Sequence, residues 1–182
     1  MTNNTGAPLD PYRPGIQPIF RYTDKIKSLD SLVEIVTKWR RAGCTTIGIS
    51  SGVFDLLHPG HCAFLNGAAT LCDKLIIIIA SDRTVKEKKG KSRPFVQEAK
   101  RAQSISALEG VSAVIISDTP YHENILRALN PERMFKGDEY MGKEIIGADL
   151  VGEMVFIPCA PEDFFHTSTL IEAIRNDTPY RP

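Results

Sequence analysis

The sequence predicts an α/β fold with a five-stranded parallel sheet, and two observations lead to this prediction. Short apolar or β-branched segments alternate along the chain with segments whose apolar residues recur at helical spacing, which is typical of right-handed βαβ units. Residues 75–80, LIIIIA, are apolar throughout, as a strand is when both faces of a parallel sheet are covered. We therefore expect a doubly wound, Rossmann-like sheet with helices on both faces. Ligands of such folds bind beyond the carboxyl ends of the strands, where the strand order reverses.

The first element expected is a helix that ends at Gly43. Apolar residues recur at helical spacing from Leu29 to Trp39, and Ser28 or Asp30 can cap the start of this helix. The strands expected after it are short and cover residues 45–50, 75–80, 113–117, 133–136 and 153–158. The helices expected between and after these strands cover residues 60–71, 95–108, 122–129 and 168–175.

Length and composition indicate one globular domain. The chain has 182 residues, and a chain of this size buries about 70% of its unfolded surface, so its core needs neither a disulfide nor a metal ion. Residues 1–24 contain several prolines and little apolar periodicity. We therefore expect an extended N-terminal arm over residues 1–24 and a single domain over residues 25–182.

Charge and cysteine content argue against several classes of protein. The 22 basic and 22 acidic residues give a formal net charge of zero, whereas nucleic-acid and membrane-surface binders usually show an uncompensated basic face. The apolar runs are far shorter than the ~20 residues of a membrane span, and the N-terminus lacks the layout of an export signal. The four cysteines include no pair at metal-site spacing. We expect a cytoplasmic protein with reduced cysteines and without a protein-held metal ion.

The residues that can carry chemistry are densest directly after the first strand, in SSGVFDLLHPGHCAFL, residues 50–65. Gly52 lets the chain turn sharply and lets a ligand approach the backbone. A helix is expected to start near Gly60, with His58 just before this start and His61 in the first turn. Because a helix N-terminus attracts phosphate, both imidazoles can donate hydrogen bonds to one phosphoryl group and stabilise its transition state.

This GxFDxxHxGH pattern is similar to the signature of the nucleotidyltransferase superfamily, which includes cytidylyltransferases and several adenylyltransferases. The residues that match are Gly52, Phe54, Asp55, His58, Gly60 and His61. The resemblance implies that His58 and His61 are catalytic and that backbone groups of Val53 and Phe54 lie along the nucleotide. It also implies that Asp55 orients the loop or the incoming phosphorylated substrate.

Three further segments agree with a phosphate site, although each has an ordinary structural explanation. Residues 84–95 form a basic segment, expected as a loop after the second strand, and its candidates for the triphosphate or the substrate phosphate are Lys86, Lys89, Lys91 and Arg93. Such a segment can also be a solvated loop. After the fourth strand come Lys136, Gly137 and Asp138, which are expected to frame the base and phosphates but can form a plain turn. Before the last helix come Thr167 and Ser168, which can hold nucleotide phosphates or only cap the helix.

Within the superfamily, residues 25–176 most resemble the adenylyltransferase domain of bacterial heptose biosynthesis. The likeness includes the GKSRP stretch with Arg93, the DTP of residues 118–120, and Lys136-Gly137 followed by Tyr140. It implies transfer of AMP from ATP to D-glycero-β-D-manno-heptose 1-phosphate, with release of pyrophosphate and with Mg²⁺ carried by the nucleotide. It also implies a product used for lipopolysaccharide or other surface glycans, and a homodimer.

The chain departs from this domain at two places, which keeps a second nucleotide open. The family reads KGGDY where residues 136–140 read KGDEY, and this version also resembles the GDDW segment of glycerol-3-phosphate cytidylyltransferases. The first hydroxyl of the family's STT is replaced by His166, and the RTEGIS of cytidylyltransferases is missing from residues 160–168. We favour ATP over CTP. The alternatives are a cytidylyltransferase acting on glycerol 3-phosphate or another phosphorylated alcohol, and a nucleotide-binding regulatory domain without turnover.

Overall fold

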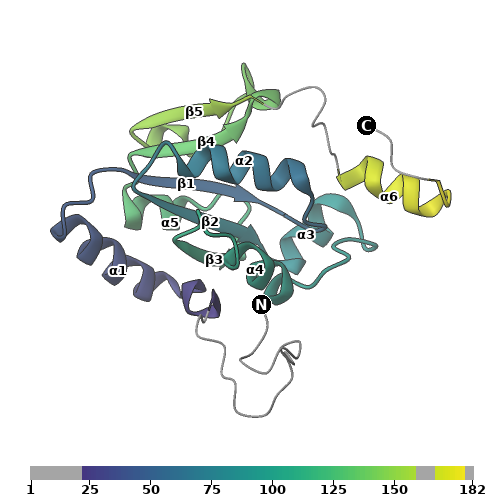
Figure 1. Ribbon diagram of the computed structural model, residues 1–182, viewed down its shortest axis with the longest axis horizontal. Coiled ribbons are helices and arrows are strands. Elements are labelled where there is room, and N and C mark those ends of the chain that lie inside the picture. The colour runs from purple at the N-terminus through teal and green to yellow at the C-terminus, as the bar shows by residue number, and fades with distance from the viewer. Residues whose placement is uncertain (1–21, 159–166, 179–182) are drawn as a thin grey trace, which may run out of the picture.

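The structure is a computed structural model that describes residues 22–158 and 167–178 (Figure 1). Its centre is one parallel sheet with the strand order β3-β2-β1-β4-β5. The strands are β1 (Ile47–Gly52), β2 (Lys74–Ala80), β3 (Ala113–Ser117), β4 (Arg133–Gly137) and β5 (Glu153–Ile157). This confirms the predicted five-stranded sheet. The strand order reverses between β1 and β4, so the carboxyl ends of these two strands are where a ligand is expected.

Helices cover both faces of this sheet, as predicted (Figure 1). The helices are α1 (Leu29–Arg41), α2 (Pro59–Ala69), α3 (Asp82–Lys89), α4 (Glu98–Ser106), α5 (Glu123–Leu129) and α6 (Thr167–Arg175). Short 3₁₀ helices are η1 (Tyr22–Lys25), η2 (Asp138–Tyr140) and η3 (Ala148–Leu150). Helices α1 and α5 pack on one face, and α2 and α4 pack on the other. In the described part of the chain, no helix is long and apolar enough to cross a membrane.

The core consists of two hydrophobic clusters separated by the sheet, and β2 contributes to both. Its side chains alternate, so that Ile76 and Ile78 pack with α1 and α5, while Ile77 and Ile79 pack with α2 and α4. All four side chains are at most 1% exposed. This two-sided burial is the physical reason why residues 75–80 show no polar alternation.

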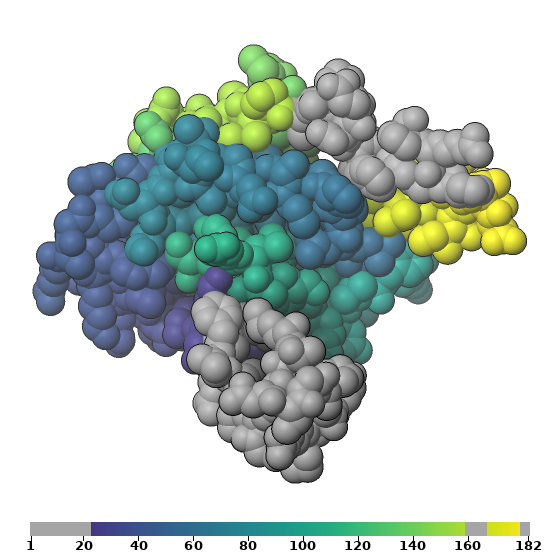
Figure 2. Space-filling model, in the orientation of Figure 1, coloured from purple at the N-terminus to yellow at the C-terminus, as the bar shows by residue number. Residues whose placement is uncertain are grey.

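The basic segment of residues 84–95 differs from its prediction as a loop. Its first half belongs to α3, which Ser81 caps by accepting a hydrogen bond of 3.2 Å from the backbone N–H of Thr84. Lysine and glutamate are good helix formers, and the helix ends at Gly90, whose φ is +91°. The helix predicted from residue 95 begins only at Glu98. Figure 2 shows α6 next to this part of the molecule, at one end of the domain.

Most of the predicted N-terminal arm lies outside the described residues, which begin at Tyr22. The residues that follow pack on the domain. Lys25 Nζ donates to the carbonyl of Leu108 at 2.9 Å, and Ile26 forms a parallel bridge with Val114 of the edge strand β3. The segment that leads into α1 is therefore fixed along this edge of the sheet.

Candidate active site

A cavity of about 510 Å³ opens at the carboxyl edge of the sheet, over the reversal between β1 and β4. This is the position forecast from the fold class, and the volume is that of a typical small-molecule site. The predicted site residues that line it are Gly52, Val53, Phe54, Asp55, His58, Gly60, His61, Lys89, Arg93, Lys136, Gly137 and Thr167. Lys86, Lys91, Asp138 and Ser168 do not line it. The fold thus brings predicted site residues from four separate segments to one cavity.

His58 is held at the start of α2 by the backbone of the helix that it caps. Its Nδ1 accepts a hydrogen bond of 3.4 Å from the N–H of His61, so its own proton lies on Nε2. That Nε2 lies 3.3 Å from Oγ1 of Thr167, the first residue of α6. The two imidazole rings stack with their centroids 3.7 Å apart and 23° between their planes. Both rings therefore lie side by side on one wall of the cavity.

His61 is uncharged at neutral pH. Burial lowers its pKa to about 4, and the neighbouring His58 and Lys89 add to this effect, while the nearby carbonyl of Leu56 opposes it. Nδ1 of His61 is buried and makes no well-aligned hydrogen bond to any residue that the structure describes. The positive charge of Lys89, which disfavours a proton on His61, favours a negatively charged ligand. An anion bound here would raise the pKa of His61.

The turn out of β1 places a close-fitting aromatic ring under this histidine pair. Phe54 has φ +50°, which is rare for an aromatic residue, and its ring meets that of His61 edge-on at a centroid distance of 5.2 Å. A Cβ on Gly52 would lie 2.8 Å from the Phe54 ring, closer than packing allows. The glycine at position 52 therefore leaves the space that the Phe54 ring occupies.

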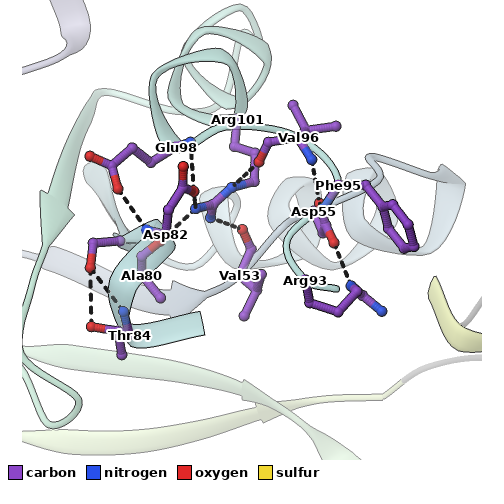
Figure 3. Close-up of polar contacts among 11 residues, drawn as sticks. Val53, Asp55, Ala80, Asp82, Thr84, Arg93, Phe95, Val96, Glu98 and Arg101 are labelled. Carbon is purple, nitrogen blue, oxygen red and sulfur yellow. Dashed lines mark hydrogen bonds and ion pairs between the residues drawn. The ribbon is translucent and has the colours of Figure 1, made fainter. Parts of the chain in front are cut away.

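Asp55 holds the loop after α3 against the cavity. Its carboxylate accepts hydrogen bonds from Arg93 Nε at 2.7 Å, from the N–H of Phe95 at 2.8 Å and from the N–H of Val96 at 2.9 Å (Figure 3). The carboxylate side chain is 1% exposed and that of Arg93 15%. Of the two roles that the sequence left open for Asp55, this geometry favours orientation of the loop over contact with the substrate.

Arg101 was not among the predicted site residues, yet it joins the loops that form the cavity wall. This buried side chain donates to the carbonyls of Val96 and Ala80 at 2.8 Å each, to that of Val53, and to Asp82 Oδ1 at 2.8 Å (Figure 3). It thereby ties the end of β1 to the end of β2 and to the loop before α4. A single arginine in an amphipathic helix resembles a surface residue, so periodicity contained no signal for this role.

A reciprocal pair of hydrogen bonds completes this network. The N–H of Glu98 donates to Asp82 Oδ1 at 2.9 Å, and the N–H of Asp82 donates to Glu98 Oε2 at 2.6 Å (Figure 3). The first turns of α3 and α4 are thus satisfied by each other's carboxylates. Together with Arg101, these contacts set the position of α3, whose last turn presents lysines to the cavity.

The lysines of α3 are divided between the cavity and the surface. All three lysines are exposed, but only Lys88 and Lys89 line the cavity, and Lys86 does not. Burial lowers the pKa of Lys89, and the nearby Arg93 adds to this effect. Lys91 lies beyond the end of the helix and is also exposed.

Lys136 bridges the two strands between which the order reverses. Its Nζ donates to Ser51 Oγ on β1 at 2.9 Å, and burial lowers its pKa with a contribution from Lys88. The ammonium also lies 5.4 Å from the ring centroid of Tyr140, at the end of η2. Residues that line the cavity here without having been predicted include Ser51, His122, Glu139 and Tyr140. Among the described residues, no three histidine, cysteine, aspartate or glutamate side chains gather as they would around a metal ion.

Comparison with known proteins identifies the family. The family model described as cytidylyltransferase-like matches residues 49–173, more than half of the chain, and this range includes the histidine pair and Lys136. The chain belongs to the cytidylyltransferase-like family. Membership confirms the resemblance to nucleotidyltransferases that the GxFDxxHxGH motif predicted.

Two curated relatives of this chain have the same name. The chain is 40% identical over 154 residues to the bifunctional protein HldE of Hyphomonas neptunium, a match that covers 82% of this chain and 31% of that protein. It is 41% identical over 129 residues to the bifunctional protein HldE of Paramagnetospirillum magneticum, covering 70% of this chain and 26% of that protein. The chain thus spans less than a third of the length of these relatives.

A solved structure shows the same architecture. The lipopolysaccharide core biosynthesis protein from Thermoplasma volcanium matches with a TM-score of 0.54 and 24% identity. The match covers 63% of this chain and 98% of that one. At this identity the likeness concerns the fold alone, and it agrees with the predicted doubly wound sheet.

Proposed function

We propose that this domain transfers AMP from ATP to a sugar 1-phosphate and releases pyrophosphate. The observation that carries the proposal is the stacked pair of His58 and His61 at the start of α2, facing a cavity at the sheet reversal in a cytidylyltransferase-like chain. The first candidate for the acceptor is D-glycero-β-D-manno-heptose 1-phosphate. Its support is the resemblance to heptose adenylyltransferase domains, together with relatives that are named HldE.

The reaction we propose is one in-line displacement. An oxygen of the acceptor's phosphate forms a bond to the α-phosphorus of ATP, while the bond between this phosphorus and the oxygen leading to the β-phosphate breaks. Pyrophosphate leaves with the electron pair of the broken bond. A phosphate monoester is already ionised near neutral pH, so no general base and no covalent enzyme intermediate are required. Catalysis then consists of positioning and electrostatic stabilisation.

The residues of the cavity wall divide this work between them. His58 and His61 would donate to the α-phosphate, where negative charge develops, and Lys89 and Arg93 would neutralise the outer phosphates. Backbone groups of Val53 and Phe54 would lie along the nucleotide. The remaining cavity residues expected at the base and phosphates are Lys136, Gly137 and Thr167. We assign Asp55 as a positioning residue, because its carboxylate is engaged with the loop that carries Arg93.

Mg²⁺ is proposed as a companion of the nucleotide. The described residues supply no cluster of three ligands, and the Asp55 carboxylate is engaged by three donors. Mg²⁺ usually binds through substrate phosphates and few protein groups, which fits a donor set of this kind. When bound, it would neutralise charge on the leaving pyrophosphate. A homodimer and a role in surface-glycan synthesis stay predictions that rest on the family resemblance, and a cytoplasmic location stays a prediction from the sequence.

The test is a panel in which each of ATP, CTP, GTP and UTP is combined with heptose 1-phosphate, other sugar 1-phosphates and glycerol 3-phosphate. We expect pyrophosphate release with ATP and a sugar 1-phosphate. Release with CTP and glycerol 3-phosphate would instead establish the second candidate, which is favoured by the KGDEY sequence of residues 136–140. Nucleotide binding without release in any combination would establish a domain without turnover.

A substitution in the histidine pair tests the assignment of roles within this function. Replacing His61 with alanine removes a donor to the transition state and should lower turnover a few hundredfold, about 3–4 kcal/mol. The matched control is Lys100→Met, which changes an exposed lysine outside the cavity. A loss below about tenfold in a folded His61→Ala protein would contradict the assigned role.

A further inference from the structure

A second group of basic side chains lines the same cavity as the histidine pair. It consists of Lys88 and His122, and it is called the second basic group below. Lys136, which is expected at the nucleotide, is a charged neighbour of both. His122 lies between β3 and α5, and α5 packs on the face of the sheet opposite to α2. The cavity is therefore bordered by imidazoles that come from both faces of the sheet.

The ring of His122 is held in place by the end of β3. Its Nδ1 lies 2.9 Å from Oγ of Ser117, a residue that is 5% exposed. The same oxygen accepts a hydrogen bond of 3.3 Å from the N–H of Thr119. The Ser117 hydroxyl can donate to Nδ1 or to the carbonyl or hydroxyl oxygen of Thr119. An anion at Nε2 selects the first arrangement, in which the proton of the imidazole lies on Nε2. His122 then has one donor to offer to a ligand.

The surroundings of His122 favour an anion as that ligand. Burial lowers the pKa of His122 to about 4, and the positive charges of Lys136 and Lys88 add to this effect. Lys88 Nζ is 3.5 Å from the carbonyl of Pro120 and 5.7 Å from the ring centroid of Tyr121, so it lies above the turn that carries His122. A neutral donor beside the ammonium group of Lys88 suits a phosphate, because a bound dianion is stabilised by both.

The proposed reaction requires two separate phosphate sites, because the nucleotide and the acceptor each carry phosphate. The charge of Lys89 lowers the pKa of His61, whereas the charge of Lys88 lowers the pKa of His122. These lysines are neighbours in the last turn of α3, where successive side chains point about 100° apart. The single cavity therefore has a basic group for each phosphate-bearing substrate.

We propose that His122 Nε2 and Lys88 bind the phosphate of the acceptor, opposite the nucleotide held by His58 and His61. This inference rests on the proposed function and names the acceptor site within it. Its prediction is selective: removing these groups weakens the binding of a phosphomonoester without weakening that of the nucleotide.

The test measures binding rather than turnover, so it does not require the acceptor's identity. Inorganic phosphate is titrated by calorimetry into protein saturated with α,β-methylene-ATP, and the nucleotide analogue is titrated separately. His122→Asn keeps a polar group near Ser117 and tolerates φ +57°, but it lacks an atom at the place of Nε2. We expect its phosphate affinity, and that of Lys88→Met, to fall about tenfold or more, with nucleotide affinity changed less than about twofold.

Two further variants serve as controls. His122→Gln places an amide nitrogen near the position of Nε2 and should recover most of the lost phosphate affinity, and Lys100→Met should resemble the wild type. Equal losses for phosphate and nucleotide, no loss in His122→Asn, or no phosphate binding by the wild type would each overturn the inference. A failure of the proposed function would give a different result. His122→Asn would still weaken phosphate binding, but no acceptor would cause pyrophosphate release.

Discussion

The interior of the sheet and the loops at its carboxyl edge are stabilised by different forces. In β2, isoleucines alternate between two hydrophobic clusters, where burial is favourable in any orientation that fills the space. The loops after β1 and β2 are held by Arg101 and Asp55, whose buried charges act only along particular directions. Hydrophobic burial thus accounts for the sheet, whereas a few directional contacts determine where the cavity wall lies.

The largest expected effect is the loss of Arg101. Arg101→Met fills much of the same space but removes the donors to three carbonyls and leaves Asp82 without its buried partner. Breaking a buried ion pair from one side commonly costs about 3–5 kcal/mol, so urea denaturation should show a loss of this size. Arg127→Met, at an exposed position on α5, is the control and should change stability by less than about 0.5 kcal/mol. Equal stabilities of the two variants would contradict the conclusion that Arg101 holds the loops at the carboxyl edge of the sheet.

A smaller effect is expected at Asp55, where loop position can be separated from charge. Asp55→Asn retains an oxygen that can accept from Phe95 and Val96 but loses the ionic contact with Arg93. Hydrogen bonds to charged groups contribute about 1.5–3 kcal/mol, and the loss of unfolding free energy should lie near the lower end of this range. Because the loop that carries Arg93 would be less well held, we also expect a higher KM for ATP. An unchanged KM would indicate that Arg93 does not act on the nucleotide.

The same contrast explains how much the sequence could predict. The sheet, its five strands and both helical layers follow from apolar periodicity, and the histidine pair follows from a motif whose spacing is local. Arg101 could not be found in this way, because three of its four partners are 19, 21 and 48 residues distant. His122 could not be found either, because the lysines beside it come from α3 and β4. The prediction of a loop over residues 84–95 failed for a related reason, since it read the lysines as a charge pattern and overlooked their helix propensity.

A substitution in β2 tests the hydrophobic interior of the sheet. Ile77→Val removes one buried methyl group from the cluster on the α2 face and should cost about 0.5–1.5 kcal/mol in urea denaturation. Because packing there is not directional, the cavity wall should stay in place, and KM for both substrates should change less than about twofold. A marked change in KM would show that the core and the site are coupled more closely than the contacts indicate.

The smallest expected effect is a dependence of stability on pH that belongs to the cavity and not to the sheet. The pKa values of His61 and His122 are lowered from about 6.5 to about 4 in the folded protein. Between these values the unfolded chain binds more protons than the folded one, so stability should fall as the pH falls from about 6.5 to about 4. Below about pH 4 both states are protonated, and these groups cause no further loss.

Paired variants separate this effect from other titrations. With His61→Asn and His122→Asn combined, the fall in unfolding free energy over this range should shrink, by an amount of the order of 1 kcal/mol after allowance for partial exposure of the rings. Ile77→Val should keep the wild-type slope. Since a bound polyphosphate raises the pKa of an adjacent imidazole, stabilisation by ATP should increase in the wild type as the pH is lowered through this range. If the double variant kept the full slope, the titrating groups would have to lie elsewhere than in the cavity.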